Sequence, residues 1–347
     1  MEGVGLNVKV FSHNDLDGVG ICILLKKLYN ISFNFTFISY NDIYKISEFF
    51  NSDEAKTYDF VFITDLNLVE DNFKCVMHTF NKFIDDISNT DEYVRFKKLF
   101  IIDHHIDTDY SIKSYINLDY NFIEYTNNLK DCATMQLYRW IIEYQSDYWC
   151  THTQNSKHED YEVNISWCKQ FADLVNDWDI FLWKEKYNFL ARNLNILFTH
   201  IKREKFIMMQ MQKTSNNFAL NKTEISIINE NLENIKKDYE RIIKQMTIKE
   251  FNNPFKYTAA IIRCDDNLSL LCDMLKDEFK NTTIDVIVNV SFKYGSINFR
   301  RINDDINLVP IANWYGGGGH PFASGCVLNP NNKTLINDFV LPSLKYN

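Results

Sequence analysis

The stretch NVKVFSHNDLDGVG, residues 7–20, decides the fold class, because it joins a strand to a helix through a polar turn. Its first five residues are rich in valine and phenylalanine, which predicts a β-strand. Residues 18–30 begin at a glycine and continue as an apolar segment, which predicts a helix. Between the two, His13, Asp15 and Asp17 give the turn more polar side chains than it needs. This junction is therefore a candidate functional site.

The first half of the chain continues as an alternation of short strands and helices. The predicted strands are residues 33–39, 58–66 and 97–105, and the predicted helices include 131–145, with Asp131 as its N-cap, and 166–177. The polar segment 146–166 is predicted to be a surface loop. Strands that alternate with helices form a mostly parallel sheet covered on both faces. We therefore expect an α/β domain over residues 1–200.

A long helix separates this domain from a second α/β unit. Between residues 222 and 246, apolar side chains recur at alternating spacings of three and four, which places one apolar stripe on a helix. The small number of heptads favours a connector between domains over a partner-binding coiled coil. We expect a helical connector over residues 201–252 and a smaller α/β C-terminal domain over residues 253–347. Its predicted elements are strands at 257–263, 284–292 and 295–301 and a helix at 267–279.

Composition limits the classes of partner. The chain has 347 residues, 46% of them hydrophobic, and a formal net charge of −9. An acidic chain lacks the broad cationic surface that a long duplex requires, so long duplex nucleic acid is not an expected partner. No apolar run approaches the roughly 20 residues of a membrane span, and the eight cysteines form no CxxC pair. We expect a soluble cytoplasmic monomer or homodimer with no membrane partner and reduced thiols.

Charged side chains gather at the carboxyl ends of three predicted strands. They are His13, Asp15, Asp17, Asp65, Asp103, His104 and His105. Ligands bind at this edge of an open α/β sheet, and so many carboxylates cannot all stay ionised together without a cation. Aspartate and histidine without cysteine suit Mn²⁺ or Mg²⁺ better than structural zinc. Their number suits two ions that share a bridging carboxylate and clamp phosphate oxygens. We expect two Mn²⁺ ions, for which Mg²⁺ or Co²⁺ can substitute.

Four short motifs, in order along the chain, carry a family resemblance. SHNDLDG at 12–18, ITDLN at 63–67 and IIDHH at 101–105 resemble three motifs of the DHH phosphoesterase superfamily. GGGGHPFASG at 316–325 resembles the glycine-rich signature of the C-terminal domain usually associated with it. The resemblance spans nearly the whole chain. The layout is most similar to the nanoRNase and oligoribonuclease branch, which also includes phosphodiesterases acting on linear dinucleotides and on 3′-phosphoadenosine 5′-phosphate.

The resemblance implies two sets of metal ligands. One ion would be held by His13, Asp15 and Asp65. The second would be held by Asp17, Asp65, His104 and one later aspartate, so that Asp65 bridges the two ions.

The resemblance also implies roles for residues near these ligands. The later aspartate lies in VNDWDIFLW, residues 175–183, where we favour Asp177 over Asp179. Asp103 would orient a neighbouring histidine. His105, which is left off the metals, would contact the scissile phosphate or protonate the leaving oxygen.

The glycine-rich segment is a candidate substrate-binding loop. Four successive glycines are costly to order, and a loop whose backbone N–H groups approach a phosphate explains them. An arginine suits bidentate phosphate contact, but strand alternation places only one of two neighbouring arginines on the face of the loop and does not say which. The candidate contacts are Arg300, Arg301, Gly317, Gly318, Gly319 and His320. Because this domain binds the terminal nucleotide in the family, the resemblance implies an active site in the interdomain cleft.

These features predict a two-metal phosphodiesterase that releases 5′-mononucleotides from short RNA or DNA oligonucleotides. The alternative substrate is a signalling nucleotide, either a linear or cyclic dinucleotide or 3′-phosphoadenosine 5′-phosphate, because the same residues would hydrolyse it. An alternative of another class is a non-catalytic nucleotide sensor. A sensor would need a broken ligand set, whereas every expected ligand is present. The sequence leaves the substrate and the polarity of attack open.

Overall fold

The computed structural model describes residues 6–29, 31–90, 94–115, 122–144 and 158–344. The chain divides into two compact units, Met1–Ile228 and Asn229–Asn347. Each unit has its own sheet and its own apolar core.

The first unit is built on a sheet of five strands that all run parallel. The strands are β1 (Asn7–His13), β2 (Ser32–Ile38), β3 (Phe60–Thr64), β4 (Lys98–Asp103) and β5 (Ile123–Asn127). Their order is β2-β1-β3-β4-β5. The direction of winding therefore reverses between β1 and β3, and the carboxyl ends of strands at such a switch point form a ligand-binding crevice.

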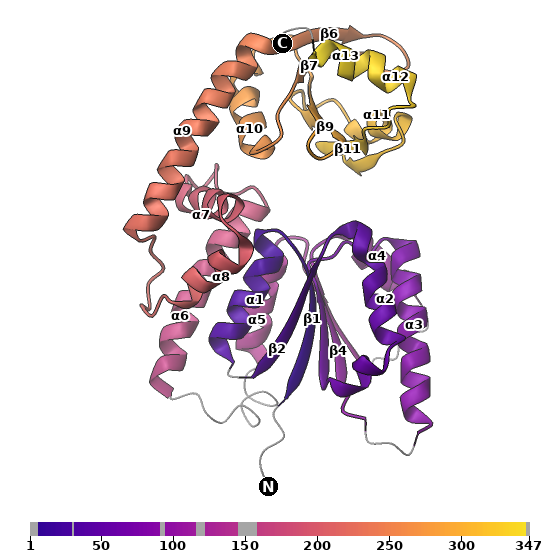
Figure 1. Ribbon diagram of the computed structural model, residues 1–347, viewed down its shortest axis with the longest axis vertical. Helices are drawn as coiled ribbons and strands as arrows, with labels where there is room; N and C mark the ends of the chain where they lie inside the picture. Colours follow the sequence, from indigo (N-terminus) through magenta and orange to yellow (C-terminus); the bar gives the residue numbers. More distant parts are fainter. Residues whose placement is uncertain (1–5, 30, 91–93, 116–121, 145–157, 345–347) are drawn as a thin grey trace. The chain divides into compact units, whose positions relative to one another are not determined.

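Helices cover both faces of this sheet (Figure 1). One face carries α1 (Leu16–Leu28), α5 (Ala133–Tyr144) and α6 (His158–Asp179), and the other carries α2 (Tyr44–Phe50), α3 (Glu70–Ser88) and α4 (Ile106–Ser114). Alternation along β3 supplies both cores: Val61 and Ile63 join the core shared with α2 and α3. Phe62 lies on the opposite face, where its ring centroid is 4.6 Å from Phe100 and 6.3 Å from Trp140 of α5. The prediction of a parallel α/β domain is confirmed.

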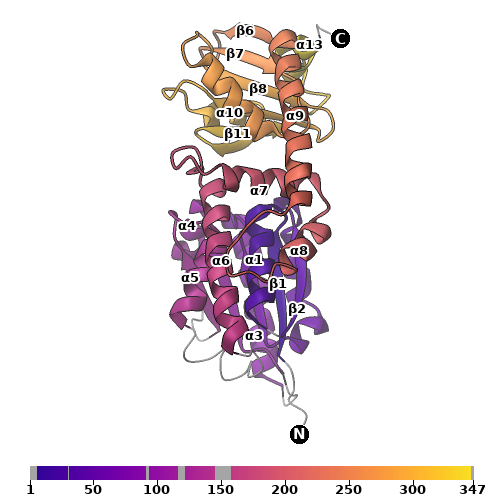
Figure 2. The same ribbon diagram turned by 90° about the vertical axis from the view of Figure 1, so that its left-hand side faces the viewer.

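The first unit is completed by further helical segments. They are the 3₁₀ turns η1 (Tyr40–Asp42) and η2 (Asp53–Thr57) and the helices α7 (Phe189–His200) and α8 (Arg203–Met211). Figure 2 shows α6, α1 and α8 side by side, and α1 packs against both of the others.

The second unit is a smaller mixed sheet with helices. Its strands are β6 (Thr247–Phe251), β7 (Tyr257–Ile262), β8 (Val286–Ser291), β9 (Ser296–Arg301), β10 (Gly318–His320) and β11 (Ala323–Val327), in the order β10-β11-β9-β8-β7-β6. Only β7 and β8 pair in parallel among these described strands. Helix α9 (Lys222–Gln245) begins in the first unit and continues into the second. The other helical segments of the second unit are α10 (Leu268–Phe279), α11 (Leu308–Trp314), α12 (Lys333–Leu335), the π-helical η3 (Ile336–Val340) and α13 (Leu341–Ser343).

Two boundaries differ from the sequence prediction. The predicted connector ends at residue 252, but β6 lies inside it and pairs with β7 in the second sheet. This strand was missed because its alternation is that of an edge strand: Ile248 is 55% exposed, and lysine and glutamate follow it. Helix α6 begins at His158, within the segment predicted to be a loop. The rest of that loop, residues 145–157, lies outside the described residues.

Two further features of the described residues concern membrane-spanning helices and cysteines. No helix among them combines the length and apolar character needed to cross a membrane. Their seven cysteines form no disulfide, and only Cys75 is exposed. Burial raises the pKa of the Cys272 thiol to about 12, so this thiol stays protonated at neutral pH.

Candidate metal centre

The predicted ligands of the first unit meet at the carboxyl edge of the parallel sheet. His13 is the last residue of β1, Asp65 directly follows β3, and His104 directly follows β4. β1 and β4 both pair with β3. The three strand ends are therefore neighbours, and the switch point lies between two of them.

One group of three possible ligands consists of His13, Asp15 and Asp65. One ligand atom from each lies within 4.8 Å of the other two. The His13 Nδ1 atom is 2.9 Å from Asp15 Oδ2 and 3.8 Å from Asp65 Oδ2. Asp15 is also the N-cap of α1, where its Oδ1 accepts a hydrogen bond of 3.0 Å from the Gly18 backbone N–H. The start of the helix therefore fixes this carboxylate beside His13.

The glycines of the first motif are needed for close packing. A Cβ atom on Gly18 would lie 2.2 Å from the carbonyl oxygen of His13, and one on Gly20 would lie 2.3 Å from Thr134 Oγ1. Both glycines are buried within α1 and have no left-handed φ. They bring α1 against β1 and α5.

A second group of three consists of Asp17, His104 and Asp179, again with one ligand atom of each within 4.8 Å of the others. The His104 Nε2 atom is 3.9 Å from Asp17 Oδ2 and 3.5 Å from Asp179 Oδ2. It is also 3.4 Å from Asp65 Oδ1. Asp65 thus turns one oxygen towards each histidine, and its backbone has a left-handed φ of 53°.

The Asp17 carboxylate is held by the N-terminus of α5. Its Oδ2 accepts from the Ala133 N–H at 2.7 Å, and its Oδ1 accepts from the Thr134 N–H at 2.8 Å. A helix N-terminus favours negative charge. Asp17 therefore provides the N-terminal capping interaction that the sequence analysis assigned to Asp131.

The surroundings of these carboxylates raise the pKa of two of them and lower that of a third. Burial, reinforced by the charges of Asp15, Asp17 and Asp179, raises the pKa of Asp65 well above its usual value. Burial and the neighbouring aspartates raise the pKa of Asp179 in the same way. Burial also acts to raise the pKa of Asp15, but its hydrogen bond and charge interaction with His13 outweigh that effect and lower it. Burial lowers the pKa of His104, which favours the neutral imidazole that binds metals.

The chemistry of the site fits divalent cations. Oδ2 of Asp65, Oδ2 of Asp103 and Oδ2 of Asp179 are buried without a hydrogen-bond partner among the described residues. An unpaired buried carboxylate oxygen is costly. A cation in each group would satisfy the unpaired oxygen of Asp65 in the first and of Asp179 in the second, and would offset the repulsion. Oxygen and imidazole ligands without cysteine match Mg²⁺ or Mn²⁺ chemistry.

The structure brings Asp179, and not the favoured Asp177, into the second group. The Asp177 side chain instead bonds to the segment that follows α6. Its Oδ1 accepts from Lys186 Nζ, and its Oδ2 accepts from Asn188 Nδ2 at 2.8 Å. Its charge is therefore already paired. We replace Asp177 by Asp179 as the candidate ligand.

His105 takes part in a chain of hydrogen bonds, and one of its ring nitrogens also lies within 4.8 Å of ligand atoms of Asp65 and His104. Its Nδ1 lies 2.8 Å from Asp103 Oδ1, and its Nε2 lies 3.3 Å from the hydroxyl of Tyr40. Burial acts to lower the pKa of His105, but the hydrogen bond and charge of Asp103 outweigh it and raise the pKa. The Tyr40 ring also stacks on His13, with centroids 4.5 Å apart and planes at 17°. Tyr40 was missed because a lone tyrosine after a strand carries no pattern.

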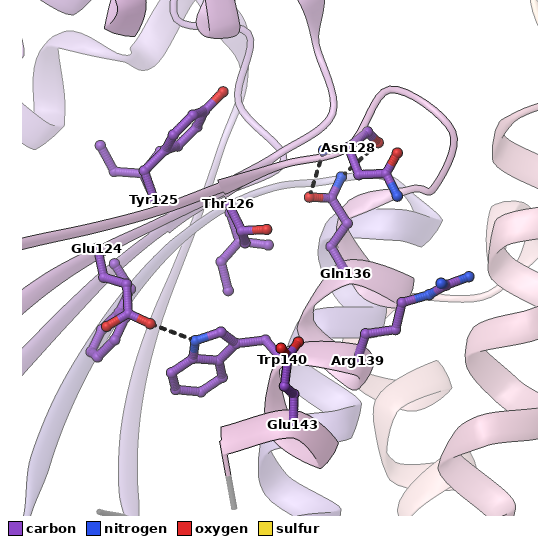
Figure 3. A pocket seen from close by; sticks show the side chains of 11 residues that line it. Glu124, Tyr125, Thr126, Asn128, Gln136, Arg139, Trp140 and Glu143 are labelled. Carbon is purple, nitrogen blue, oxygen red and sulfur yellow. Dashed lines mark hydrogen bonds between the residues drawn. The ribbon is translucent and has the colours of Figure 1, made fainter.

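A pocket of about 510 Å³ lies beside the centre, between β4, β5 and α5 (Figure 3). None of its lining residues is a predicted ligand. Trp140 Nε1 donates to Glu124 Oε1 at 2.7 Å across it. At one end, Gln136 exchanges hydrogen bonds with the Asn128 backbone and donates to the carbonyl oxygen of Asp103 at 3.0 Å. This amide supports the backbone that carries the two histidines.

In the second unit the two arginines differ in their partners. The Arg301 guanidinium lies 3.2 Å from Asp304 Oδ1 and donates to the Asp304 carbonyl oxygen at 3.1 Å. Arg300 donates to the carbonyl oxygen of Phe299, and no carboxylate among the described residues pairs with it. Arg300 is therefore the freer of the two to bind an anion.

The glycine-rich segment has structural reasons for several of its glycines. A Cβ atom on Gly317 would lie 2.0 Å from the Gly325 carbonyl oxygen, and Gly319 has a left-handed φ of 133°. Gly318 alone has neither constraint, because its nearest neighbour would be 3.8 Å away. Packing against β11 thus accounts for part of the glycine run that the sequence analysis attributed to phosphate binding. The side chain of His320 lies outside the described residues.

Comparisons with known proteins agree with this fold. No family model matches the chain. Oligoribonuclease NrnB of Bacillus subtilis (strain 168) is 27% identical over 327 residues, which cover 91% of this chain and 72% of that protein. The solved DHH domain of a member of a family of ribosomal proteins has a TM-score of 0.53 at 12% identity, covering 99% of this chain and 87% of that one. A pGpG-specific phosphodiesterase of Vibrio cholerae has a TM-score of 0.41 at 11% identity, covering 96% of each chain.

The fold and the site define a doubly wound α/β protein with aspartate and histidine side chains gathered as candidate metal ligands at its switch point. Its ordered motifs, their meeting at one sheet edge, and the similar fold of a solved DHH domain make the chain similar to proteins of the DHH phosphoesterase superfamily.

Proposed function

We propose that the chain is a divalent-metal-dependent phosphodiesterase that hydrolyses short oligonucleotides to 5′-mononucleotides. The position of Asp65 carries this proposal, because its two oxygens face His13 and His104, which belong to different ligand groups. A carboxylate in that position can bridge two cations. The name of the Bacillus subtilis relative, an oligoribonuclease, supports short RNA as the substrate class.

The proposal assigns two Mn²⁺ ions, for which Mg²⁺ or Co²⁺ can substitute. Their ligands would be His13, Asp15 and Asp65 for one ion and Asp17, Asp65, His104 and Asp179 for the other. Such ions supply charge that binds phosphate oxygens and lowers the pKa of a water molecule. The chain contributes the fixed geometry of these ligands, since strand ends and helix starts hold them.

His105 is the residue we assign to proton transfer. Asp103 holds its Nδ1 side, so Nε2, which lies 3.3 Å from the Tyr40 hydroxyl, is the nitrogen that would hold or release a proton near the substrate. The raised pKa of His105 favours the protonated form that can contact a phosphate oxygen or protonate a leaving oxygen. In the second unit, we assign phosphate contact to Arg300 and the backbone around Gly318, because these have the fewest competing roles.

The test is hydrolysis of 5′-labelled RNA of two to twenty-four nucleotides with Mn²⁺, beside a cyclic dinucleotide and 3′-phosphoadenosine 5′-phosphate. Fast loss of the two- to five-nucleotide RNAs, with the longer ones spared, supports the proposal. Preference for one of the other compounds would move the function to signalling nucleotides, and no turnover with Mn²⁺ bound would indicate a sensor. His104→Ala should abolish activity, and His78→Ala, which alters an exposed histidine of α3, should leave it unchanged.

A further inference from the structure

Three exposed aromatic side chains follow the candidate ligand Asp179 on one short segment. We call residues 180–189 the aromatic loop. Phe181 is 55% exposed, Tyr187 79% and Phe189 51%. A group of large exposed apolar side chains beside a functional site is typical of a binding surface.

The backbone holds two of these side chains in a conformation that such residues rarely adopt. Phe181 has a φ of 61° and Tyr187 has a φ of 53°. A left-handed backbone is strained at a bulky residue, because its Cβ atom crowds the neighbouring carbonyl oxygen. Strain of this kind persists only where the surrounding structure enforces it, and it gathers at functional sites.

Asp177 holds the backbone of the aromatic loop in this conformation. It is buried, and its carboxylate accepts hydrogen bonds from Lys186 and Asn188 while its carbonyl oxygen accepts from the Trp183 N–H at 2.9 Å. The Asn188 N–H closes the loop on the Trp183 carbonyl oxygen at 2.7 Å. The Trp183 ring is itself buried and lies 5.9 Å from the Trp178 ring. The loop is therefore ordered by its own hydrogen bonds and by Trp183, whose ring centroid lies 6.4 Å from that of Phe189. The side chains of Phe181 and Tyr187 take no part in these contacts.

We propose that the aromatic loop binds the nucleobases of a short single-stranded oligonucleotide, by stacking on Phe181 and Tyr187. This rests on the proposed function, because the phosphate of the same substrate would lie at the metal centre. Phe181 is two residues from Asp179, so their Cα atoms are at most about 7 Å apart. Aromatic side chains stack on any base, which suits hydrolysis without sequence preference. The Arg192 guanidinium lies 5.1 Å from the Phe189 ring centroid and adds a positive charge to this surface.

The proposal predicts a defect in substrate binding that depends on the bases. Phe181→Leu and Tyr187→Leu keep an apolar side chain and remove the ring. Each should raise KM for an RNA dinucleotide roughly 5- to 100-fold, the range expected for loss of one stacked base, with kcat within about twofold. Tyr187→Phe keeps the ring and should restore the wild-type KM. The same dinucleotide without its bases should show equal KM values for wild type and variants.

A matched control and a second readout separate this inference from the proposed function. Tyr294→Leu removes a tyrosine that is 62% exposed and lies in the turn between β8 and β9, and it should leave KM unchanged. The fluorescence of a 2-aminopurine dinucleotide is quenched when its base stacks on an aromatic side chain. Its quenching by the protein in EDTA therefore reports stacking without catalysis. If wild type quenches the probe but hydrolyses nothing, the proposed function fails and the stacking site stands. Unchanged KM and unchanged quenching in Phe181→Leu and Tyr187→Leu, with wild-type thermal stability, would overturn the stacking site.

Discussion

Asp65→Asn should stabilise the metal-free protein while it removes metal binding. Asp65 is 1% exposed and has a left-handed backbone. Asparagine has the same size and tolerates that backbone, so the substitution removes the charge without adding strain. The new side chain would no longer repel the neighbouring aspartates, but its neutral amide could not bridge two cations.

The size of the effect follows from the spacing of the carboxylates. An oxygen of Asp65 lies within 4.8 Å of one of Asp15. Two unit charges at that separation repel by roughly 3.5 kcal/mol at an effective dielectric constant of about 20. Solvent and partial protonation relieve part of this repulsion, so we expect a gain of about 1–2 kcal/mol. In a domain of this size, that raises the melting temperature by about 2–8 °C.

The gain in stability of Asp65→Asn over wild type should increase with pH. Because the folded protein raises the pKa of Asp65, ionisation of Asp65 destabilises the folded state. Its contribution to stability is present in acid, below the usual aspartate pKa of about 4, and is lost as the pH rises through the folded-state pKa. The difference between Asp65→Asn and wild type should therefore be small near pH 4 and largest near pH 8.

Thermal unfolding in EDTA and in saturating Mn²⁺ measures both effects. Wild type should gain several degrees with Mn²⁺, because a ligand at about 100 times its Kd adds about 2.7 kcal/mol, and the variant should gain almost nothing. Asp59→Asn is the matched control: this buried aspartate is paired with Arg95 at 2.6 Å, so its loss should lower the melting temperature. A lower melting temperature for Asp65→Asn in EDTA at pH 8, or a preserved Mn²⁺ shift, would refute the reasoning.

Three further substitutions test neighbouring parts of the account. Asp179→Asn should reduce metal-dependent hydrolysis at least about 100-fold without loss of stability in EDTA. Asp177→Asn should instead lower the free energy of unfolding by about 1–3 kcal/mol. Urea unfolding and activity assays of both variants test this assignment, and the opposite pattern would show that the two aspartates have exchanged roles. Gly18→Ala should destabilise by about 2–3 kcal/mol or more, because its Cβ would lie 2.2 Å from the His13 carbonyl oxygen; a soluble variant with wild-type urea unfolding contradicts that packing. Gln136→Leu should cost about 1–3 kcal/mol, since the amide donates to three backbone carbonyl oxygens; an unchanged urea midpoint would show that these bonds contribute nothing.

The sheet and most of the metal centre could be predicted because the relevant signals are local. Strands β1, β3 and β4 are short apolar runs; His13 ends the first, and Asp65 and His104 directly follow the other two. Strand β5 was not predicted, because only Ile123 of its five residues is buried. Parallel strands then bring their carboxyl ends to one edge whatever the order of pairing. The strand order itself is not written in any one segment, and the switch point became visible only in the structure.

Other features depend on packing that no local pattern records. Asp177 and Asp179 lie two residues apart near the end of one helix, so they point about 200° apart and only one can face the site. The choice depends on Lys186, which follows in the next loop and pairs with Asp177. Tyr40 joins the site through a 3₁₀ turn, and β6 is an edge strand without an apolar face. These were missed because tertiary contacts, and not composition, assign their roles.

Anomalous diffraction from crystals grown with Mn²⁺ tests the central claim most directly. The account predicts two Mn²⁺ peaks about 3.5–4 Å apart, with one oxygen of Asp65 on each ion and Asp179 beside His104 on the second. A single peak, two peaks without Asp65 between them, or Asp177 in place of Asp179 would contradict it.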